Sequence, residues 1–397
     1  MGAMLSVEEA QARVLALAPC PRIEQVSPEA AGGRYLATDL VAERTQPPAD
    51  LSAMDGYAVA GPGPWRLVGE SRAGAPFAGR LDAGECTRIS TGAHVPAGAD
   101  SVLLQEDADL SAPGMVRALE LPRPGQHIRQ RGFDFAEGEV VLKAGARIGA
   151  AQLALALSAG HGSLPVSAPP RVAVLDSGDE LVADPADCGL HQIPASNGAM
   201  IGAMLASLGC EVLRLGPVAD DAAALAAALA RAESADILVT TGGASVGDHD
   251  LIRPALESWG ARLDFWKVAM KPGKPILVAT RDSGSGQQVI FGLPGNPVSS
   301  FVTCFLFVLP LVRAAMGSAA PLPQRATVPA GDTLPPVGKR REFLRAIWDG
   351  ECVRAAASQD SSALAALASA NCLVDRAAGS ERTEAGTSVP VYLLENG

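Results

Sequence analysis

Between Arg171 and about Met316, short β-type apolar runs alternate with helical patterns of apolar residues. This alternation predicts a mostly parallel sheet covered by helices on both faces. The predicted strands are Arg171–Leu175, Glu211–Leu215, Asp236–Thr240 and Gln288–Phe291, with further extended segments at Leu263–Val268 and Pro275–Ala279. The predicted helices are Asn197–Leu208, Asp221 to about Ala232, Ile252–Trp259, and a last one that starts at Pro297 with Asn296 as its cap.

The patterns elsewhere predict a multidomain chain in which β-rich domains flank this central, doubly wound α/β domain. We expect a discontinuous first domain (5–44 and 124–167), in which the N-terminal segment, a short helix followed by extended chain, packs with a helix over Ile148–Ala159. A Gly- and Pro-punctuated β-rich domain (45–123) would be inserted into it. The α/β domain would cover 168–319, and a small C-terminal β domain would cover 320–397.

Composition narrows the class of protein. The seven cysteines stand singly without a C-x-x-C pair, which argues against both a disulfide framework and a zinc site and favours a reducing, cytoplasmic compartment. The net charge of −11 argues against nucleic acid as a partner. The longest apolar run, Phe301–Val312, is shorter than the roughly 20 residues of a membrane span, so we expect no membrane insertion.

Five polar loops follow the predicted strands of the α/β domain, where open α/β sheets bind their ligands. They are Asp176–Glu180, Pro217–Asp221, Thr241–Asp250, Met270–Pro275 and Gly292–Ser300. Taken alone, each loop could be a plain structural feature: a turn with a solvated acid, a surface lysine or a helix cap. Their convergence on one edge favours a binding site.

The residue types of these loops indicate a reaction class. Acids such as Asp179, Glu180, Asp220 and Asp250 are hard oxygen ligands suited to Mg²⁺ that bridges phosphates. Lys271 and Lys274 lie in a loop stiffened by proline, and such a pair suits a tetrahedral oxyanion or a phosphate. With no Ser-His-Asp or Cys-His arrangement, the residues favour metal-assisted attack on a phosphoanhydride.

The run of motifs resembles the molybdopterin molybdenumtransferases, the family of MoeA and the gephyrin E domain. Its most characteristic motif is similar to Ser-Ala-Met-Asp-Gly-Tyr-Ala-Val (52–59), and its second to Arg88–Asp100 with Gln105 and Glu106. Further matching segments follow in the family's order and cover nearly the whole chain: Arg129–Gly132, Ser177–Leu181, Gly242–Gly247 with Asp250, Lys271–Pro275, Gly292–Ser299, Arg341–Phe343 and Gln359–Leu364.

The resemblance implies an elongated four-domain homodimer with a MogA-like α/β domain and a C-terminal domain like a small β-barrel. It implies an enzyme that takes adenylyl-molybdopterin from an upstream molybdopterin adenylyltransferase. The enzyme would hydrolyse the adenylate and transfer molybdate to the dithiolene with the help of Mg²⁺, giving molybdenum cofactor and AMP.

The resemblance also assigns roles to individual residues. Asp55 and Thr91 of the inserted domain would be catalytic together with Glu180, Asp220 and Asp250, of which Glu180 and Asp250 would hold the metal. Substrate would be bound by Gly242, Gly243, Ser245, Lys271, Lys274, Pro294, Pro297, Ser299, Arg341, Ser361 and Ser362. The choices between Asp220 and Asp221, and between Ser361 and Ser362, stay open at this point.

Two segments depart from the family pattern. Asp176 and Ser177 stand where Ser-Thr is commoner, and Ala195–Gly198 lacks the usual acid before Ser/Thr-Asn and the usual Arg or Tyr after it. Two other functions stay open. One is the related adenylyltransferase, although that enzyme lacks the segment around Met54–Tyr57. The other is a non-catalytic molybdopterin-binding scaffold, which would need partner regions not seen in this chain.

Overall fold

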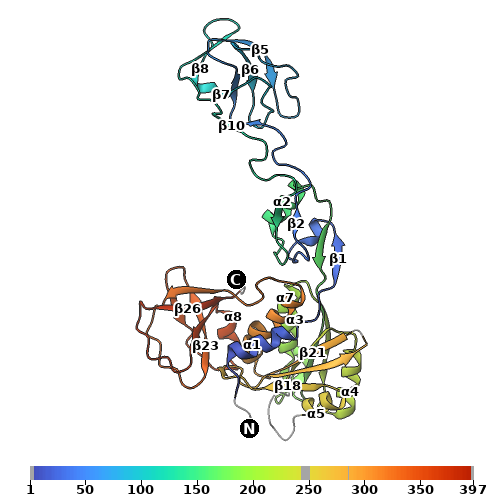
Figure 1. Ribbon diagram of the computed structural model, residues 1–397. Helices are drawn as coiled ribbons and strands as arrows, with labels where there is room; N and C mark the ends of the chain where they lie inside the picture. The colour runs from blue at the N-terminus through green and yellow to red at the C-terminus, as the bar shows by residue number, and fades with distance from the viewer. Residues whose placement is uncertain (1–3, 243–250, 285, 395–397) are drawn as a thin grey trace.

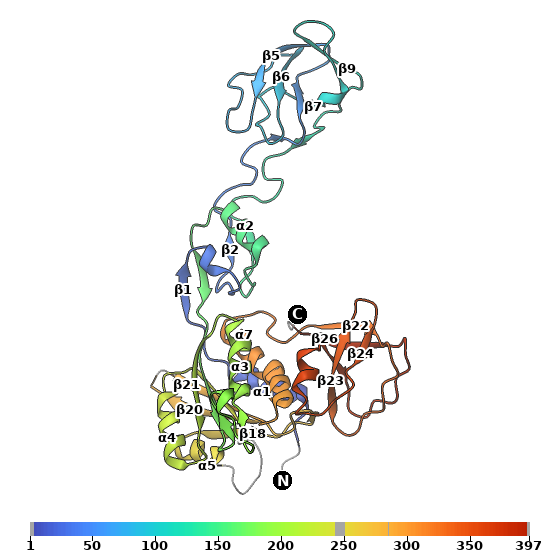
Figure 2. The ribbon, with the colours of Figure 1, turned by 180° about the vertical axis from the view of Figure 1, so that it is seen from behind.

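The chain forms an elongated molecule in which a β-rich unit stands well apart from the α/β unit, as both ribbon views show (Figures 1 and 2). The structure is a computed structural model that describes residues 4–242, 251–284 and 286–394. The chain leaves the α/β unit near its N-terminus, runs out to the distant unit, and returns before the central sheet begins.

The central sheet has the strand order β16-β13-β17-β21-β20-β18. The first four strands are parallel, whereas β20 runs antiparallel to both of its neighbours. The prediction of a mostly parallel sheet is therefore confirmed. The strand bounds are β13 (Arg171–Ser177), β16 (Glu211–Val218), β17 (Ile237–Thr241), β18 (Arg262–Trp266), β20 (Leu277–Ser283) and β21 (Gly286–Leu293).

Side chains of successive residues leave a strand on opposite faces, so each face of this sheet has its own core. Val172 and Val174 pack into the cluster that includes α3 (Ser196–Ala206), α6 (Pro297–Thr303) and α7 (Leu309–Ala315). Ala173 and Leu175 pack on the other side against α4 (Ala222–Arg231) and α5 (Ile252–Ser258). Helices thus cover both faces, which confirms the doubly wound architecture.

The one described helix that is both long and apolar is a core element. Helix α6 continues through a π-helical segment, η4 (Cys304–Val308), into α7, and together they span Pro297–Ala315. This 19-residue helix is longer than the apolar run in the sequence, and it is long and apolar enough to cross a membrane. However, 89% of its most apolar window is buried inside the fold, which is typical of a core helix.

The N-terminal helix α1 (Val7–Ala16) falls in the range predicted for the first domain but packs on the α/β unit, whereas Leu36 and Leu40 of the same range pack with Ala156 of the helix at Ala150–Ser158. The buried face of α1, Val7, Ala10 and Val14, joins the core cluster of α6 and α7. The buried amide of Gln11 donates to the carbonyl oxygen of Leu306 at 3.0 Å. The apolar spacing in the sequence showed that α1 has a face to bury, but it did not show against which partner.

The remainder of the first domain is built from two stretches that lie far apart in the sequence. Strand β1 (Ile23–Val26) pairs with β12 (Leu164–Ser167), and β2 (Leu40–Val41) pairs with β11 (Val140–Leu142). Helix α2 (Ala150–Ser158) and the short 3-10 helix η1 (Glu29–Ala31) cover these pairs and contribute Ala156 and Ala31 to a small shared core.

The inserted unit is a six-stranded sheet with the order β7-β4-β6-β5-β9-β8. It extends slightly further along the chain than the predicted limit of residue 123. Ile128 packs beside Val102, and β10 (Ile128–Arg129) pairs with β3 (Leu51–Ser52). The other bounds are β4 (Gly56–Val59), β5 (Trp65–Ser71), β6 (Glu85–Ile89), β7 (Ser101–Leu104), η2 (Gln105–Asp107), β8 (Ala108–Asp109) and β9 (Met115–Ala118).

The C-terminal unit is a sheet curled almost into a barrel. Its strands follow the order β23-β25-β26-β22, and β24 pairs with the outer side of β23. Ala330, just after β22, bridges Val353 in β24 and so brings the two ends together. The bounds are β22 (Arg325–Pro329), β23 (Arg341–Trp348), β24 (Val353–Ala355), α8 (Leu364–Ala368), β25 (Cys372–Arg376) and β26 (Ser388–Leu393).

Candidate functional site

The polar loops meet at one edge of the central sheet. Strands β13, β16, β17 and β21 are parallel, so their carboxyl ends share an edge. Strand β18 is antiparallel to β20, which is antiparallel to β21. The end of β18 therefore lies at this edge as well, and the loop that carries Lys271 and Lys274 starts there. The strand directions confirm that four of the five loops, and the first two residues of the fifth, Thr241 and Gly242, start or end at this edge.

Carboxylates gather at the ends of β13 and β16. The Ser177 hydroxyl donates to Asp220 Oδ1 at 2.8 Å, and the backbone N–H of Asp220 donates to Asp179 Oδ1 at 3.0 Å. Glu180, next in the chain, folds back over Gly178, where a Cβ would lie only 2.6 Å from Glu180 Oε2. Asp179, Glu180 and Asp220 are all exposed. The edge thus presents three carboxylates to solvent.

The contacts of Asp220 and Asp221 separate their roles. The Asp221 carboxylate accepts from the backbone N–H of Ala224 at 2.8 Å and caps helix α4. The Asp220 carboxylate turns instead to Ser177 at the end of β13. Because Asp221 is committed to the helix, Asp220 is the acid that faces the edge of the sheet.

This group of acids fits the way proteins hold Mg²⁺. Within the described ranges, no set of three or more His, Cys, Asp or Glu side chains stands close enough to enclose a metal ion by itself. Magnesium usually keeps several waters and is held by one or two carboxylates together with substrate phosphates. Glu180 and Asp220 offer such oxygens. Asp250, the second predicted ligand, lies outside the described residues, as do Gly243 and Ser245.

Gly242 begins the glycine-rich segment after β17 and is held tightly. Its backbone N–H donates to the carbonyl oxygen of Leu293 at 3.2 Å. Its φ is +88°, and a Cβ here would lie 2.8 Å from the carbonyl oxygen of Ser177. The left-handed conformation and this close approach both require glycine. The ends of β13, β17 and β21 therefore meet at Gly242.

The loop Met270–Pro275, which carries Lys271 and Lys274 and is called the lysine loop below, rests on helix α6. Gly273 has a φ of +94°, and a Cβ there would lie 2.5 Å from Thr303 Cγ2 and 3.6 Å from the carbonyl oxygen of Ser299. The preceding residues, β19 (Met270–Lys271), pair with the first residues of β23. Lys271 Nζ donates to Glu342 Oε1 at 3.1 Å. Lys274 is exposed, and no ion pair joins it to another described residue.

The N-terminus of α6 is bound by the C-terminal unit. Asn296 occupies the cap position, as predicted, but its amide donates to Ser361 Oγ at 2.9 Å and makes no capping bond. The Ser361 carbonyl oxygen accepts the N–H of Val298 at 3.1 Å. Ser362 donates instead to Asp360 at 2.6 Å. Of the two serines, Ser361 is therefore the one that contacts the segment of Pro294, Pro297 and Ser299. Its carbonyl oxygen already occupies the N–H of Val298 in the first turn of the helix.

Arg341 is committed to a buried ion pair. Its Nε and Nη2 donate to the two carboxylate oxygens of Asp375 at 2.6 and 2.5 Å, and Nη1 contacts Glu8 of helix α1. Burial opposes the charge of the guanidinium, but the Asp375 hydrogen bonds and the two carboxylate charges outweigh it and raise the pKa of Arg341. The described contacts of Arg341 hold α1 to the C-terminal unit.

Asp55 and Thr91 lie together in the inserted unit. The backbone N–H of Thr91 donates to Asp55 Oδ1 at 2.6 Å, and both residues are exposed. Both ribbon views place their unit far from the edge of the central sheet in the same chain (Figures 1 and 2). The structure therefore brings these two residues to one another but not to Glu180 or Asp220.

Three family descriptions match successive parts of the chain. The MoeA N-terminal region, domains I and II, matches residues 5–160. A probable molybdopterin binding domain matches 173–314, and the MoeA C-terminal region, domain IV, matches 327–394. The chain belongs to the MoeA family.

Curated relatives carry names that agree with this family. The molybdopterin molybdenumtransferase of Haemophilus influenzae is 36% identical over 327 residues, which cover 79% of this chain and 78% of the relative. Molybdopterin molybdenumtransferase 2 of Mycobacterium tuberculosis is 35% identical over 410 residues, covering 98% of this chain and 100% of the relative.

Solved MoeA structures have the same fold. One MoeA protein from Pyrococcus horikoshii superposes with a TM-score of 0.85 at 25% identity and covers 99% of this chain and 100% of its own. A second structure of MoeA from this organism gives a TM-score of 0.78 at 29% identity and covers 98% and 99%.

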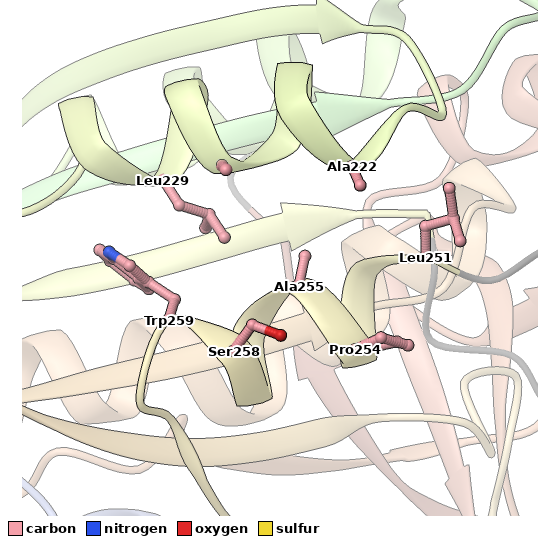
Figure 3. A pocket seen from close by; sticks show the side chains of 8 residues that line it. Ala222, Leu229, Leu251, Pro254, Ala255, Ser258 and Trp259 are labelled. Carbon is pink, nitrogen blue, oxygen red and sulfur yellow. The ribbon is translucent and has the colours of Figure 1, made fainter.

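Two hollows of this MoeA family member lie away from its polar edge. An apolar groove of about 250 Å³ runs between α4 and α5 and is lined by residues such as Leu229, Leu251 and Trp259 (Figure 3). A second hollow of about 350 Å³, with Arg22 and Asp236, lies at the opposite end of the strands. The candidate site is therefore placed by its chemistry and not by the shape of these hollows.

Some residues that shape the site were not singled out from the MoeA motifs. The buried Asp176 accepts from Thr241 Oγ1 at 2.5 Å and from Arg214 Nη2 at 3.0 Å. The Asn197 amide donates to the carbonyl oxygen of Gly295 at 2.7 Å. Asp176 and Asn197 stand in the two segments that depart from the family pattern, and Asp176 also opens the polar loop Asp176–Glu180; these were the signals in the sequence.

Proposed function

We propose that this protein is a molybdenum insertase, which cleaves adenylyl-molybdopterin and transfers molybdate to the dithiolene of the pterin. The products would be molybdenum cofactor and AMP. The observation that carries the proposal is the pairing of two kinds of group on one edge of the sheet. Exposed carboxylates stand at the ends of β13 and β16, and a lysine loop follows β18. Relatives named molybdopterin molybdenumtransferase support the same reaction.

The carboxylates would bind the metal ion that acts on the phosphoanhydride. Glu180 and Asp220, with Asp250 from outside the described residues, would hold Mg²⁺ against the pyrophosphate. Mg²⁺ held there would neutralise the negative charge of the phosphates and so favour attack by water on the phosphoanhydride. Ser177 fixes the orientation of Asp220 through its hydrogen bond. The left-handed turn at Gly242 would start the glycine-rich segment that approaches the phosphate.

The cationic end of the edge would hold molybdate. Lys274 is the exposed ammonium of the lysine loop, and Lys271 lies beside it with Glu342 as its partner. Ser361 and Ser299 flank the first turn of α6, on which that loop rests. Two lysines attract a dianion such as molybdate, and the close packing of Gly273 on Thr303 limits the motion of the loop.

Asp55 and Thr91 would complete the site from a second chain. Their unit lies far from the edge of its own chain, so their participation requires another copy. A closed two-fold dimer presents each surface twice and can place one chain's inserted unit against its partner's sheet edge. We therefore propose a homodimer that is supplied by a molybdopterin adenylyltransferase and works in the cytoplasm.

The direct test is release of AMP from adenylyl-molybdopterin by the purified protein, with and without molybdate. We expect AMP and active cofactor to form together, and only when molybdate is present. An adenylyltransferase would instead make the adenylate from ATP, and a scaffold would bind the adenylate without turnover. Either of these results would reject the proposed reaction.

The metal assignment has its own test. At limiting Mg²⁺, Asp250→Ala and Glu180→Ala should release AMP much more slowly than the wild type, because loss of a metal-bridging carboxylate costs several kcal/mol of transition-state stabilisation. Glu257→Ala is a suitable control, since that acid sits on α5 in an exposed pair with Arg253. A wild-type rate for Asp250→Ala would show that the assignment is wrong.

A further inference from the structure

Asp176 is a buried carboxylate to which the proposed reaction gives no role. It lies near the end of β13 and is 1% exposed. Buried carboxylates are rare unless they are paired and hydrogen-bonded, because loss of hydration disfavours the charge. Asp176 is satisfied by the Thr241 hydroxyl at 2.5 Å and by Arg214 Nη2 at 3.0 Å. Its partners come from the two strands that flank β13.

A third segment is fitted against the same carboxylate. Gly198 stands in the first turn of α3, and a Cβ at this position would lie 2.1 Å from Asp176 Oδ2. Real Cβ atoms essentially never come closer than 3.0 Å to another heavy atom. Residue 198 must therefore be glycine as long as the Asp176 carboxylate stays in place. The unusual Asp176 and the unusual Gly198 therefore belong together, because the carboxylate of one fills the space that a side chain of the other would need.

The network reaches the backbone of the candidate site. Thr241 is the last residue of β17 and leads directly into Gly242. Asn197, the neighbour of Gly198, holds the carbonyl oxygen of Gly295 at 2.7 Å. A Cβ on Gly295 would lie 3.8 Å from the Cα of Gly242. The Asp176 carboxylate thus anchors the turn after β17 through Thr241, and the helix turn packed against it carries Asn197, which holds the turn after β21.

We propose that Asp176 is a positioning residue that fixes Thr241–Gly242 and Asn197–Gly295 as the cradle for the phosphate of the adenylated pterin. The proposal rests on the proposed function, since it gives that site its phosphate-binding backbone. Asp176 itself does not touch the substrate. It acts through the Thr241 hydroxyl and through the space that Gly198 leaves free.

The test is a double-mutant cycle between Asp176 and Thr241. Thr241→Val and Asp176→Ala should each raise the KM for adenylyl-molybdopterin about tenfold, the scale expected for one hydrogen bond to a charged group, and should leave kcat within about twofold. The double variant should be no worse than the worse single variant, because both changes remove the same contact. Thr241→Ser keeps the hydroxyl and should stay close to the wild type.

Asp236 provides a matched control at the other end of β17. It precedes the strand, accepts from the backbone N–H of Arg171 at 2.8 Å, and pairs with Arg22 at 3.3 Å. Asp236→Ala therefore removes a paired carboxylate of the same sheet, away from the candidate site. It should lower the Tm without changing KM. An equal change of KM in Asp236→Ala and Asp176→Ala would reduce the role of Asp176 to stability alone.

AMP binding, measured by calorimetry, separates this proposal from the proposed function. Weaker AMP binding by Thr241→Val supports the positioning role, whether or not the wild type turns over the adenylate. Absence of turnover by the wild type would reject only the proposed reaction. Unchanged AMP affinity and KM in an active Thr241→Val protein would overturn the positioning role and leave the reaction standing.

A thermal measurement checks the geometry without any ligand. Gly198→Ala should lower the Tm, and Asp176→Ala/Gly198→Ala should recover part of that loss. A Gly198→Ala protein as stable as the wild type would contradict the arrangement on which the proposal is built.

Discussion

Arg341 and Asp375 form a two-pronged ion pair in which Asp375 is buried and Arg341 largely so, with side chains 3% and 11% exposed. Removal of one partner from such a pair leaves an uncompensated buried charge and typically costs about 3 to 5 kcal/mol. We therefore expect Arg341→Ala to lose stability on this scale, reduced to the extent that Arg325, 3.2 Å from Asp375, takes over. Chemical denaturation measures the loss.

A surface pair gives the comparison for this prediction. Arg382 and Glu384 are largely exposed, and such pairs contribute about 0 to 1 kcal/mol. Arg382→Ala should therefore be almost neutral. Suppose instead that Arg341→Ala leaves the stability unchanged but raises the molybdate concentration needed for cofactor formation. Arg341 would then be a molybdate ligand, as its place in the family motif implies, and not a structural residue.

The two lysines of the lysine loop should respond differently to substitution. Lys274 is exposed and forms no ion pair with any described residue, whereas Lys271 is paired with Glu342. We expect Lys274→Ala to raise the molybdate concentration for half-maximal cofactor formation about tenfold with little change of Tm, and Lys271→Ala to have a smaller effect. Lys143→Ala, which breaks a surface pair with Asp39, is the control. Unchanged molybdate dependence in Lys274→Ala would rule out its role.

Neighbouring acids should show opposite defects. Asp221 caps α4, so Asp221→Ala should cost about 0.5 to 2 kcal/mol of stability and retain most activity. Asp220 faces the strand edge, so Asp220→Ala should keep its stability and lose AMP release. Urea unfolding and AMP release, measured on both variants, test this pair. Loss of activity in Asp221→Ala alone would reverse the assignment.

Mixed dimers test whether the site is shared. Asp55→Ala and Glu180→Ala should each be inactive alone. Co-expressed with different tags, about half of the dimers should be mixed, and each of these should have one intact site of two. Roughly a quarter of wild-type activity should then return. Confirmed mixed dimers without activity would place Asp55 and Glu180 in the site of a single chain.

Thiol labelling tests the packing of the cores. Cys86, Cys210, Cys304 and Cys372 are buried, whereas Cys20 is exposed and Cys188 and Cys352 are partly exposed. Burial raises the pKa of Cys86 and of Cys210 to about 12. At pH 8 the native protein should therefore react rapidly at Cys20, more slowly at Cys188 and Cys352, and at the other four only on unfolding. Rapid labelling of Cys304 would contradict the packing of the long core helix.

The sequence predicted those features that depend on local patterns. Strand and helix positions in the α/β unit agree with the apolar spacing of the sequence. The loops converge because the strands that precede them run parallel. The partners of individual side chains could not be predicted this way. Asp375 lies 34 residues from Arg341 and Leu306 lies 295 from Gln11. Such contacts depend on how units pack, which periodicity within one element does not encode.

The same reasoning explains the departures from the family pattern. Asp176 and Gly198 each looked like an isolated loss of a usual residue, because the residues are read one at a time along the chain. In space, the carboxylate of one occupies the place that a side chain of the other would need. A clash is a property of a pair of positions, so only the folded backbone could show that the two substitutions belong together.

The distant inserted unit has a consequence for how the molecule comes apart. It contains its own apolar clusters, one around Trp65 and Val116 and another around Ile89 and Val102. Only two crossings of the chain tie it to the remainder. Its cooperative melting should therefore be independent of the α/β unit of its own chain, and calorimetry of the intact chain should show more than one transition. A single melting temperature would then describe whichever unit the chosen probe happens to report.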